Sequence, residues 1–199
     1  MALTFKYNKS SLYELGDQLA MREKALPTLK SKEAALRVEV KKVRRRTMEY
    51  EEQLNDRKHE LKNLARLWGE FEEGLVKIKS ATYQAKTIAG VKIPVLEEFE
   101  FDVAEISQYH KPDWFLDGIR ILKDLTHLSL LRDLAAKATQ ILEHARKKTT
   151  QKVNLYEKVQ IPEHREAIRK IKRFLEDEEN LGKAAQKILK RRNQQTTVA

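Results

Sequence analysis

A long heptad pattern near the start of the chain constrains the fold more than any other sequence feature. Counted from Leu12, ten heptads give one column of core positions every seven residues, and a second column begins at Leu15. Sixteen of the twenty core positions from Leu12 to Ile78 are apolar or aromatic. This alternating spacing of three and four predicts a narrow coiled-coil seam. The seam would lie on a helix roughly 100 Å long, which requires a second helix to cover it.

Polar residues interrupt the seam at four core positions. They are Arg22, Glu33, Thr47 and Arg57. Because a polar residue inside a coiled coil fixes register at a cost in stability, we interpret them as register-fixing residues. A local partner-binding spot is the alternative. Pro27 lies within the seam, which keeps its phase on both sides, so we expect a kink and not a break.

A second apolar stripe begins after residue 114 and supplies the covering helix. It runs from Leu116 to Val159 and resumes after Pro162 as far as Ile188. The stretch from Asp124 to Lys190 is 67 residues long, as is the stretch from Leu12 to Ile78. Equal lengths predict that the two arms pair antiparallel along their whole length, with both termini at one end.

The period changes to two between the arms, which indicates β-strands. Apolar and polar residues alternate around Val91, Ile93 and Val95, and again around Phe99, Phe101 and Val103. We expect two short strands joined at Leu96 and Glu97, with Pro94 on an unpaired edge. An isolated hairpin is marginally stable in water, so its apolar face needs either the local helices or another protein. The candidate contact residues are Val91, Ile93, Phe99 and Phe101.

The predicted fold class is mainly α, a long antiparallel two-helix coiled coil with a short β-hairpin-containing middle. The expected divisions are an N-terminal arm over residues 1–80, an acidic middle over 81–114 and a C-terminal arm over 115–199. Their net charges are +5, −3 and +8, within a total of +10. With 35% charged residues, six Gly and four Pro, the composition is typical of long helices.

Patterns associated with catalysis are missing from the sequence. There is no Gly-rich phosphate loop, and the five His have no metal-ligand spacing. A two-helix rod also leaves little room for a pocket. We therefore expect no catalytic site, no cofactor and no metal. The absence of Cys, of an apolar signal core and of a membrane-length apolar window favours a cytoplasmic protein.

Two stretches of the arms resemble the family of central-stalk D subunits of vacuolar/archaeal-type (V-type) rotary ATPases. In the first arm the resemblance rests on the leucines at 12, 15 and 19 and on the run Leu29-Lys30-Ser31-Lys32. In the second arm the family pattern is Val-Asn-x-x-Glu-x-x-x-Ile-Pro. Its counterparts here are Val153, Asn154, Glu157, Ile161 and Pro162. Pro27 departs from the family, which continues an ordinary helix there.

The resemblance implies a non-catalytic rotor shaft that transmits torque between a nucleotide-binding ring and a membrane ion-translocating rotor. It implies four kinds of partner: catalytic and non-catalytic ring subunits, the small F subunit of the stalk and a membrane-rotor adaptor. The membrane would be reached only through the complex. The residues expected inside the ring are Lys183, Lys187, Lys190, Arg191 and Arg192.

The net charge of +10 also permits a different function, a basic coiled-coil module that binds nucleic acid or an anionic membrane surface. Both charge signs are mixed along the arms, and no aromatic residues interleave the basic runs. The two hypotheses differ in salt dependence, because binding to nucleic acid weakens steeply as salt rises.

Overall fold

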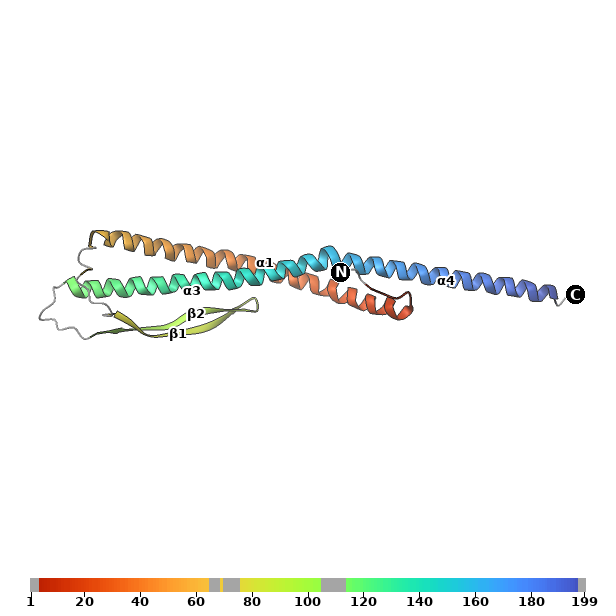
Figure 1. Cartoon of the computed structure of the whole chain (residues 1–199), viewed down its shortest axis with the longest axis horizontal. Helices are drawn as coiled ribbons and strands as arrows, with labels where there is room; N and C mark the ends of the chain where they lie inside the picture. The colour runs from red at the N-terminus through yellow and green to blue at the C-terminus, as the bar shows by residue number, and fades with distance from the viewer. Residues whose placement is uncertain (1–3, 65–68, 70–75, 105–113, 197–199) are drawn as a thin grey trace. The chain divides into compact units, whose positions relative to one another are not determined.

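The computed structural model describes residues 4–64, 69, 76–104 and 114–196. Its elements, in chain order, are α1 (Lys9–Glu60), a 3₁₀ turn η1 (Leu61–Leu64), β1 (Val76–Ile88), β2 (Val91–Val103), α3 (Trp114–Leu155), a π-helical segment η3 (Tyr156–Gln160) and α4 (Ile161–Thr196). The predicted fold class, mainly helical with a β-hairpin in the middle, is confirmed (Figure 1). The chain divides into two compact units: Met1–Ser31 with Thr149–Ala199, and Lys32–Lys148.

The heptad seam is confirmed along most of α1. Every seam position from Leu12 to Leu54 is buried or half-buried, and Leu36 is completely buried. The helix also continues through Pro27, so no break occurs there. The helix α1 ends at Glu60, so it is shorter than the predicted seam, which runs to Ile78.

Four predicted seam positions follow the end of α1 and its 3₁₀ turn. Trp68, Phe71 and Leu75 lie outside the described residues, and Ile78 is in strand β1 rather than in a helix. Ile78 fits both a heptad position and a strand, so the apolar pattern could not distinguish the two. Apolar residues alone therefore placed the end of the first arm too late.

The hairpin is longer than predicted and turns at a different place. β1 and β2 pair antiparallel from Val76 opposite Val103 to Ile88 opposite Val91. Ala89 and Gly90 form the turn with φ of 48° and 75°, the left-handed values that a two-residue type I′ turn requires. The predicted turn at Leu96 and Glu97 is wrong, because these residues and both predicted strands belong to β2.

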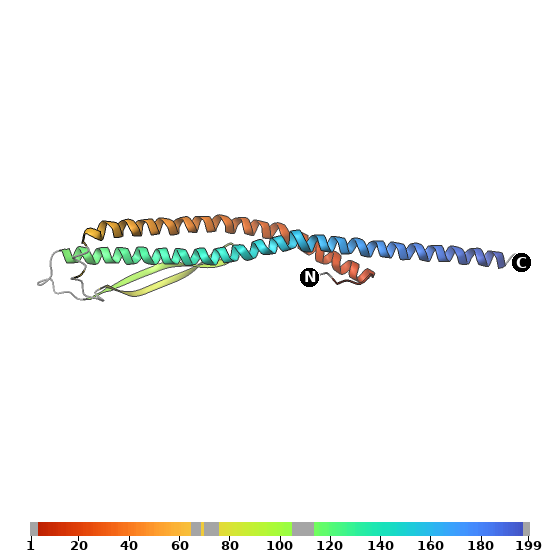
Figure 2. The ribbon, with the colours of Figure 1, turned by 45° about the horizontal axis from the view of Figure 1, so that its top comes forward.

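The apolar side of the hairpin packs on the local helices within the second unit. Ile93 of β2 is buried in one cluster with Leu36 of α1 and Leu142 of α3. At the other end of the hairpin, Val76 and Val103 pack against the start of α3. Figures 1 and 2 show the hairpin lying along α3. The sequence left open whether the local helices or another protein would cover the apolar face of the hairpin. In the structure the local helices cover it.

The first unit pairs the start of α1 with the segment from the end of α3 into α4. Leu15 of α1 is buried against Ala167 and Ile171 of α4. Exposed ion pairs flank this core, with 2.6 Å between Arg165 and Glu23 and 2.6 Å between Lys30 and Glu157. Partner numbers fall as α1 numbers rise, so the predicted antiparallel direction is confirmed.

The predicted pairing over the full length of the arms is wrong. Because Leu15 lies opposite Ala167, the start of α1 is level with Leu175, which packs beside the Leu15 cluster, and Lys9 shares an open groove with Glu178 and Glu179. All side chains from residue 176 to 193 are exposed. In Figures 1 and 2 this part of α4 extends beyond the start of α1 with no other drawn helix or strand beside it.

Candidate partner-binding surfaces

The residues of the family motif surround the π-helical segment between α3 and α4. Val153 and Ile161 are buried in the helix pairing, whereas Asn154 and Pro162 are exposed. Glu157 accepts a hydrogen bond from Lys30 of α1 at 2.6 Å. Val153, Ile161 and Glu157 thus hold the two arms of the first unit together. Asn154 and Pro162 are exposed to solvent on the outside of the helix pair.

Pro162 gives a physical reason for the π-helical turn. Proline cannot donate a backbone hydrogen bond, and inside a regular helix its ring clashes with the carbonyl four residues earlier. The preceding turn is wider, since the N–H of Ile161 donates to the carbonyl of Tyr156, five residues back. A local widening of this kind accommodates the proline without ending the helix.

A polar layer crosses the apolar seam beside this turn. It consists of Gln18, Arg22, Gln160 and His164. Nε of Arg22 donates to Oε1 of Gln160 at 2.9 Å, and Nη1 donates to the carbonyl of Gln18 at 2.9 Å. Nδ1 of His164 donates to the carbonyl of Gln160 at 2.7 Å, and Nε2 lies 3.2 Å from Oε1 of Gln18. Two of these contacts, Arg22 with Gln160 and His164 with Gln18, join the facing helices. Together they specify one register of the helix pair.

Sequence reasoning identified only part of this polar layer. Arg22 was predicted as a register-fixing residue, but His164 was missed although it is 1% exposed. Its signal was available, because His164 lies seven residues before Ile171 and three before Ala167, on the same buried helix face. A histidine at a seam position facing a predicted polar layer was the pattern to look for.

The other polar seam residues are of two kinds. The hydroxyl of Thr47 lies 3.4 Å from that of Thr139 on α3, so it too contacts the facing helix. Glu33 and Arg57 make ion pairs along α1 itself, with Arg37 and Glu60. Contacts with the facing helix therefore support the interpretation of Arg22 and Thr47 as register-fixing residues.

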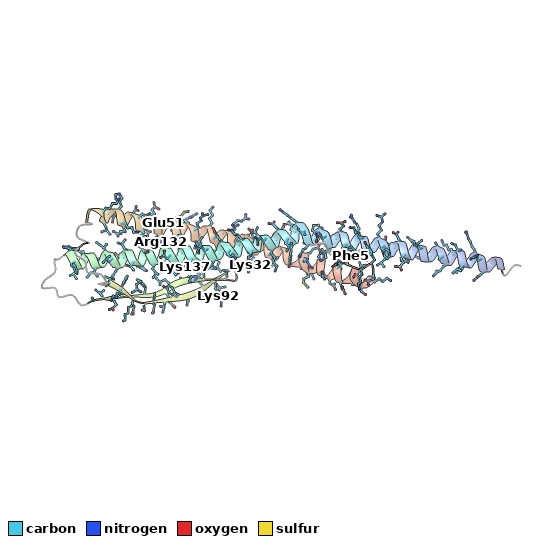
Figure 3. All side chains as sticks on the ribbon, in the orientation of Figure 1. Phe5, Lys32, Glu51, Lys92, Arg132 and Lys137 are labelled. Atoms are coloured by element: carbon cyan, nitrogen blue, oxygen red, sulfur yellow. The ribbon has the colours of Figure 1, made fainter. Side chains whose placement is uncertain are left out.

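The basic residues predicted to contact the ring lie on the exposed end of α4. Lys183, Lys187, Lys190, Arg191 and Arg192 are all exposed. Apolar side chains accompany them, because Leu181 is 71% exposed and Ile188 is 60% exposed. In Figure 3 side chains project above and below the ribbon along this end of α4. A helix that presents both apolar and basic residues to solvent has the composition of a protein-binding surface.

One ion pair organises the start of the exposed segment. Nζ of Lys183 lies 2.7 Å from Oε1 of Glu179, one helical turn away. The hydrogen bond and the positive charge of Lys183 hold the pKa of the Glu179 carboxyl below its usual value. Glu179 therefore stays ionised at neutral pH and supports the exposed helix.

The candidate contact residues of the middle segment face inward to different degrees. Ile93 is buried in the core, and Val91 packs against the same core cluster. Phe99 and Phe101 are half-buried; the ring of Phe99 stacks on His127 of α3 at 5.7 Å. The structure thus brings these four residues to one side of the hairpin, facing the helices of their own unit.

The described part of the chain was also compared with what a small-molecule pocket, a metal site and a membrane-spanning helix require. An open groove of about 430 Å³ lies between the end of α1 and α3, and Asp56, Arg57, Asp124 and His127 are among the residues that line it. No group of three or more His, Asp or Glu residues in the described ranges is arranged to hold a metal ion. Among the helices described, none combines the length and apolar character that crossing a membrane demands.

Sequence comparison with known proteins matches nearly the whole chain. The family model for the D subunit of ATP synthase matches residues 11–191. The D subunit of the V-type ATP synthase from Borreliella burgdorferi is 29% identical over 188 residues, covering 93% of both chains. The V-type D subunit of Chlamydia muridarum is 29% identical over 200 residues and 98% of both chains. That of Chlamydia pneumoniae is 28% identical over 182 residues, 89% of this chain and 87% of the relative. This chain belongs to the family of ATP synthase D subunits.

Proposed function

We propose that this chain is the central-stalk rotor shaft of a V-type ATP synthase, without a catalytic site of its own. It transmits torque between a ring of catalytic and non-catalytic nucleotide-binding subunits and the ion-translocating rotor in the membrane. The observation that carries the proposal is the exposed end of α4. Its apolar and basic side chains are covered by no described part of this chain, and an outside surface is needed to bury them.

The cross-helix contacts support a torque-bearing role. A shaft must resist sliding and unwinding of one helix against the other. The polar layer, the Thr47–Thr139 contact and the two ion pairs of the first unit each oppose such sliding. Register-specific polar contacts of this kind are expected in a coiled coil that must keep one alignment under load.

Two further contacts of the shaft are part of the proposal. The middle segment meets the small F subunit of the stalk, and an adaptor subunit connects the shaft to the membrane rotor. The chain is thereby peripheral to the membrane on the cytoplasmic side, reaching it through the complex. Because the apolar side of the hairpin packs on the helices, its exposed residues are available to that small stalk partner; Tyr83 is 52% exposed and Val95 is 39% exposed.

Affinity purification of the tagged chain from native membranes tests the proposal. The shaft should recover stoichiometric ring subunits and should retain them at moderate salt. The alternative, a basic module for nucleic acid or anionic membranes, should instead bind DNA or anionic vesicles tightly and lose them as salt rises. Recovery of nucleic acid without ring subunits would contradict the shaft.

A further inference from the structure

The exposed end of α4 has an apolar stripe on one face. Leu181, Ala184, Ala185 and Ile188 recur at spacings of three and four residues, which places them together on the helix. All four are exposed in the structure, Leu181 to 71% and Ile188 to 60%. Leu181 and Ile188, the two large residues of the stripe, lie symmetrically about the Ala184–Ala185 bond, and Leu189, 58% exposed, borders the stripe at the Ile188 end.

Charges extend this symmetry on the same face. Asp177 and Glu178 lie one helical turn before Leu181, and Arg191 and Arg192 lie one turn after Ile188. The stripe therefore has an acidic pair at one end and a basic pair at the other. The ion pair between Glu179 and Lys183 lies toward the opposite side of the helix and leaves this face unchanged.

A helix with this pattern is complementary to its own antiparallel copy. Antiparallel alignment about Ala184 and Ala185 puts Leu181 of one chain against Ile188 of the other, twice. It also puts Asp177 and Glu178 beside the second copy's Arg191 and Arg192, again twice. Parallel alignment places equal charges together, which is unfavourable. The acidic pair at one end of the stripe and the basic pair at the other thus favour a second copy of this helix in antiparallel orientation.

We propose that the chain, when it is not assembled with other subunits, pairs with a second copy of itself through residues 177–192 of α4. The pairing buries the same surface that the proposed shaft presents to the ring. Self-pairing and ring binding are therefore mutually exclusive, and the pair keeps the exposed apolar stripe covered before assembly. The inference depends on the surface of α4 and not on the identity of the ring.

Sedimentation of the full-length chain at low ionic strength tests the pairing. The weight-average mass should rise from 23.3 kDa toward twice that value as concentration increases, and added salt should reverse the rise. A Leu181→Ala, Ile188→Ala double variant should remain monomeric with unchanged helix content, since both residues are exposed and alanine favours helix. Its matched control is Val38→Ala with Met48→Ala, two exposed apolar residues of α1.

Charge reversal separates this interface from any other mode of association. The Asp177→Lys, Glu178→Lys variant and the Arg191→Glu, Arg192→Glu variant should each be monomeric. Mixed in equal amounts, the two should form a heterodimer, because attractive acidic–basic contacts are restored at both ends of the pair. Reversal of Glu51 and Glu52 to Lys on α1 is the charge-matched control and should pair as the original chain does.

Three outcomes would overturn the inference. The first is a mass of one chain at all concentrations up to about 1 mM, the weak end of measurable affinities. The second is self-association that survives the double alanine substitution. The third is an equal mixture of the two reversed variants that stays monomeric while the original chain pairs.

Discussion

His164 and Gln18 meet across the helix pair of the first unit, with 3.2 Å between Nε2 of the imidazole and Oε1 of the amide. They are 146 positions apart in the sequence. The contact joins a histidine that is almost fully buried to a polar residue on the facing helix. It fixes the alignment of α1 with α4 at this level.

The buried histidine should be important for stability. His164→Ala opens a cavity and removes a partner from both Gln18 and the Gln160 carbonyl, so we expect the free energy of unfolding to fall by about 2 kcal/mol or more. Chemical denaturation measures the change. His144→Ala is the control, because His144 is exposed, and it should stay within about 0.5 kcal/mol of the original chain. Equal effects of the two substitutions would show that the polar layer is not structural.

The register of the helix pair can be tested by cross-linking. The sequence has no cysteine, so introduced pairs react without background. Glu23→Cys with Arg165→Cys should join within one chain through a short bis-maleimide, since these residues form an ion pair in the structure. Leu19→Cys with Ala185→Cys, the pair that equal arm lengths favour, should not join. Preferential joining of 19 to 185 would contradict the observed register.

Ile93 should contribute strongly to the attachment of the hairpin. Ile93→Ala removes a side chain that is 5% exposed and is buried with residues of α1 and α3. We expect a loss of about 2–4 kcal/mol in unfolding free energy. Val95→Ala, two positions along the same strand and 39% exposed, should cost less than about 1 kcal/mol. A stable Ile93 variant that loses only partner binding would assign this residue to an external interface instead.

The exposed end of α4 should respond to acid through Glu179. Its pKa is lowered by Lys183, so the ionised form favours the helix. This support is present above pH 4.5, the usual value for the group, and is lost as pH falls below it. In an NMR titration, Lys183→Ala should raise the Glu179 midpoint, whereas Lys187→Ala should leave it nearly unchanged. Equal midpoints in all three proteins would show that the ion pair does not form in solution.

Much of the helical fold was predictable because the seam repeats over many heptads. Positions from Leu12 to Leu54 followed the predicted burial without exception. The alignment of the arms was not predictable from the seam, because sliding one helix by a heptad leaves an apolar seam equally well matched. Polar contacts across the helices distinguish these alignments, and His164 was needed to recognise the polar layer among them.

Strand β1 could not be predicted from its own sequence. Between Val76 and Ile88 most side chains are exposed, and polar residues such as Lys79 and Gln84 interrupt the apolar ones. Its conformation comes from pairing with β2 and not from local pattern, which is the usual case for strands at a sheet edge. The turn at Ala89 and Gly90 was the remaining signal, since glycine readily adopts positive φ.

The exposed basic residues of α4 were predicted as candidate contacts, but their full exposure was not. The equal-length argument placed Lys183 to Arg192 beside the start of α1. The observed register leaves them uncovered. This exposure now makes removal of the segment a clean test, since every side chain described from residue 182 to 193 is exposed.

The central claim is tested most directly by reconstituting the rotary complex with a chain that ends at Leu181. The proposed shaft loses its contact with the ring, so ATP-driven ion pumping should fall well below that of the complete complex. The melting temperature of the isolated chain should stay nearly unchanged, because residues 182–193 are all exposed. Complexes that assemble with the shortened chain and pump ions at the original rate would contradict the account.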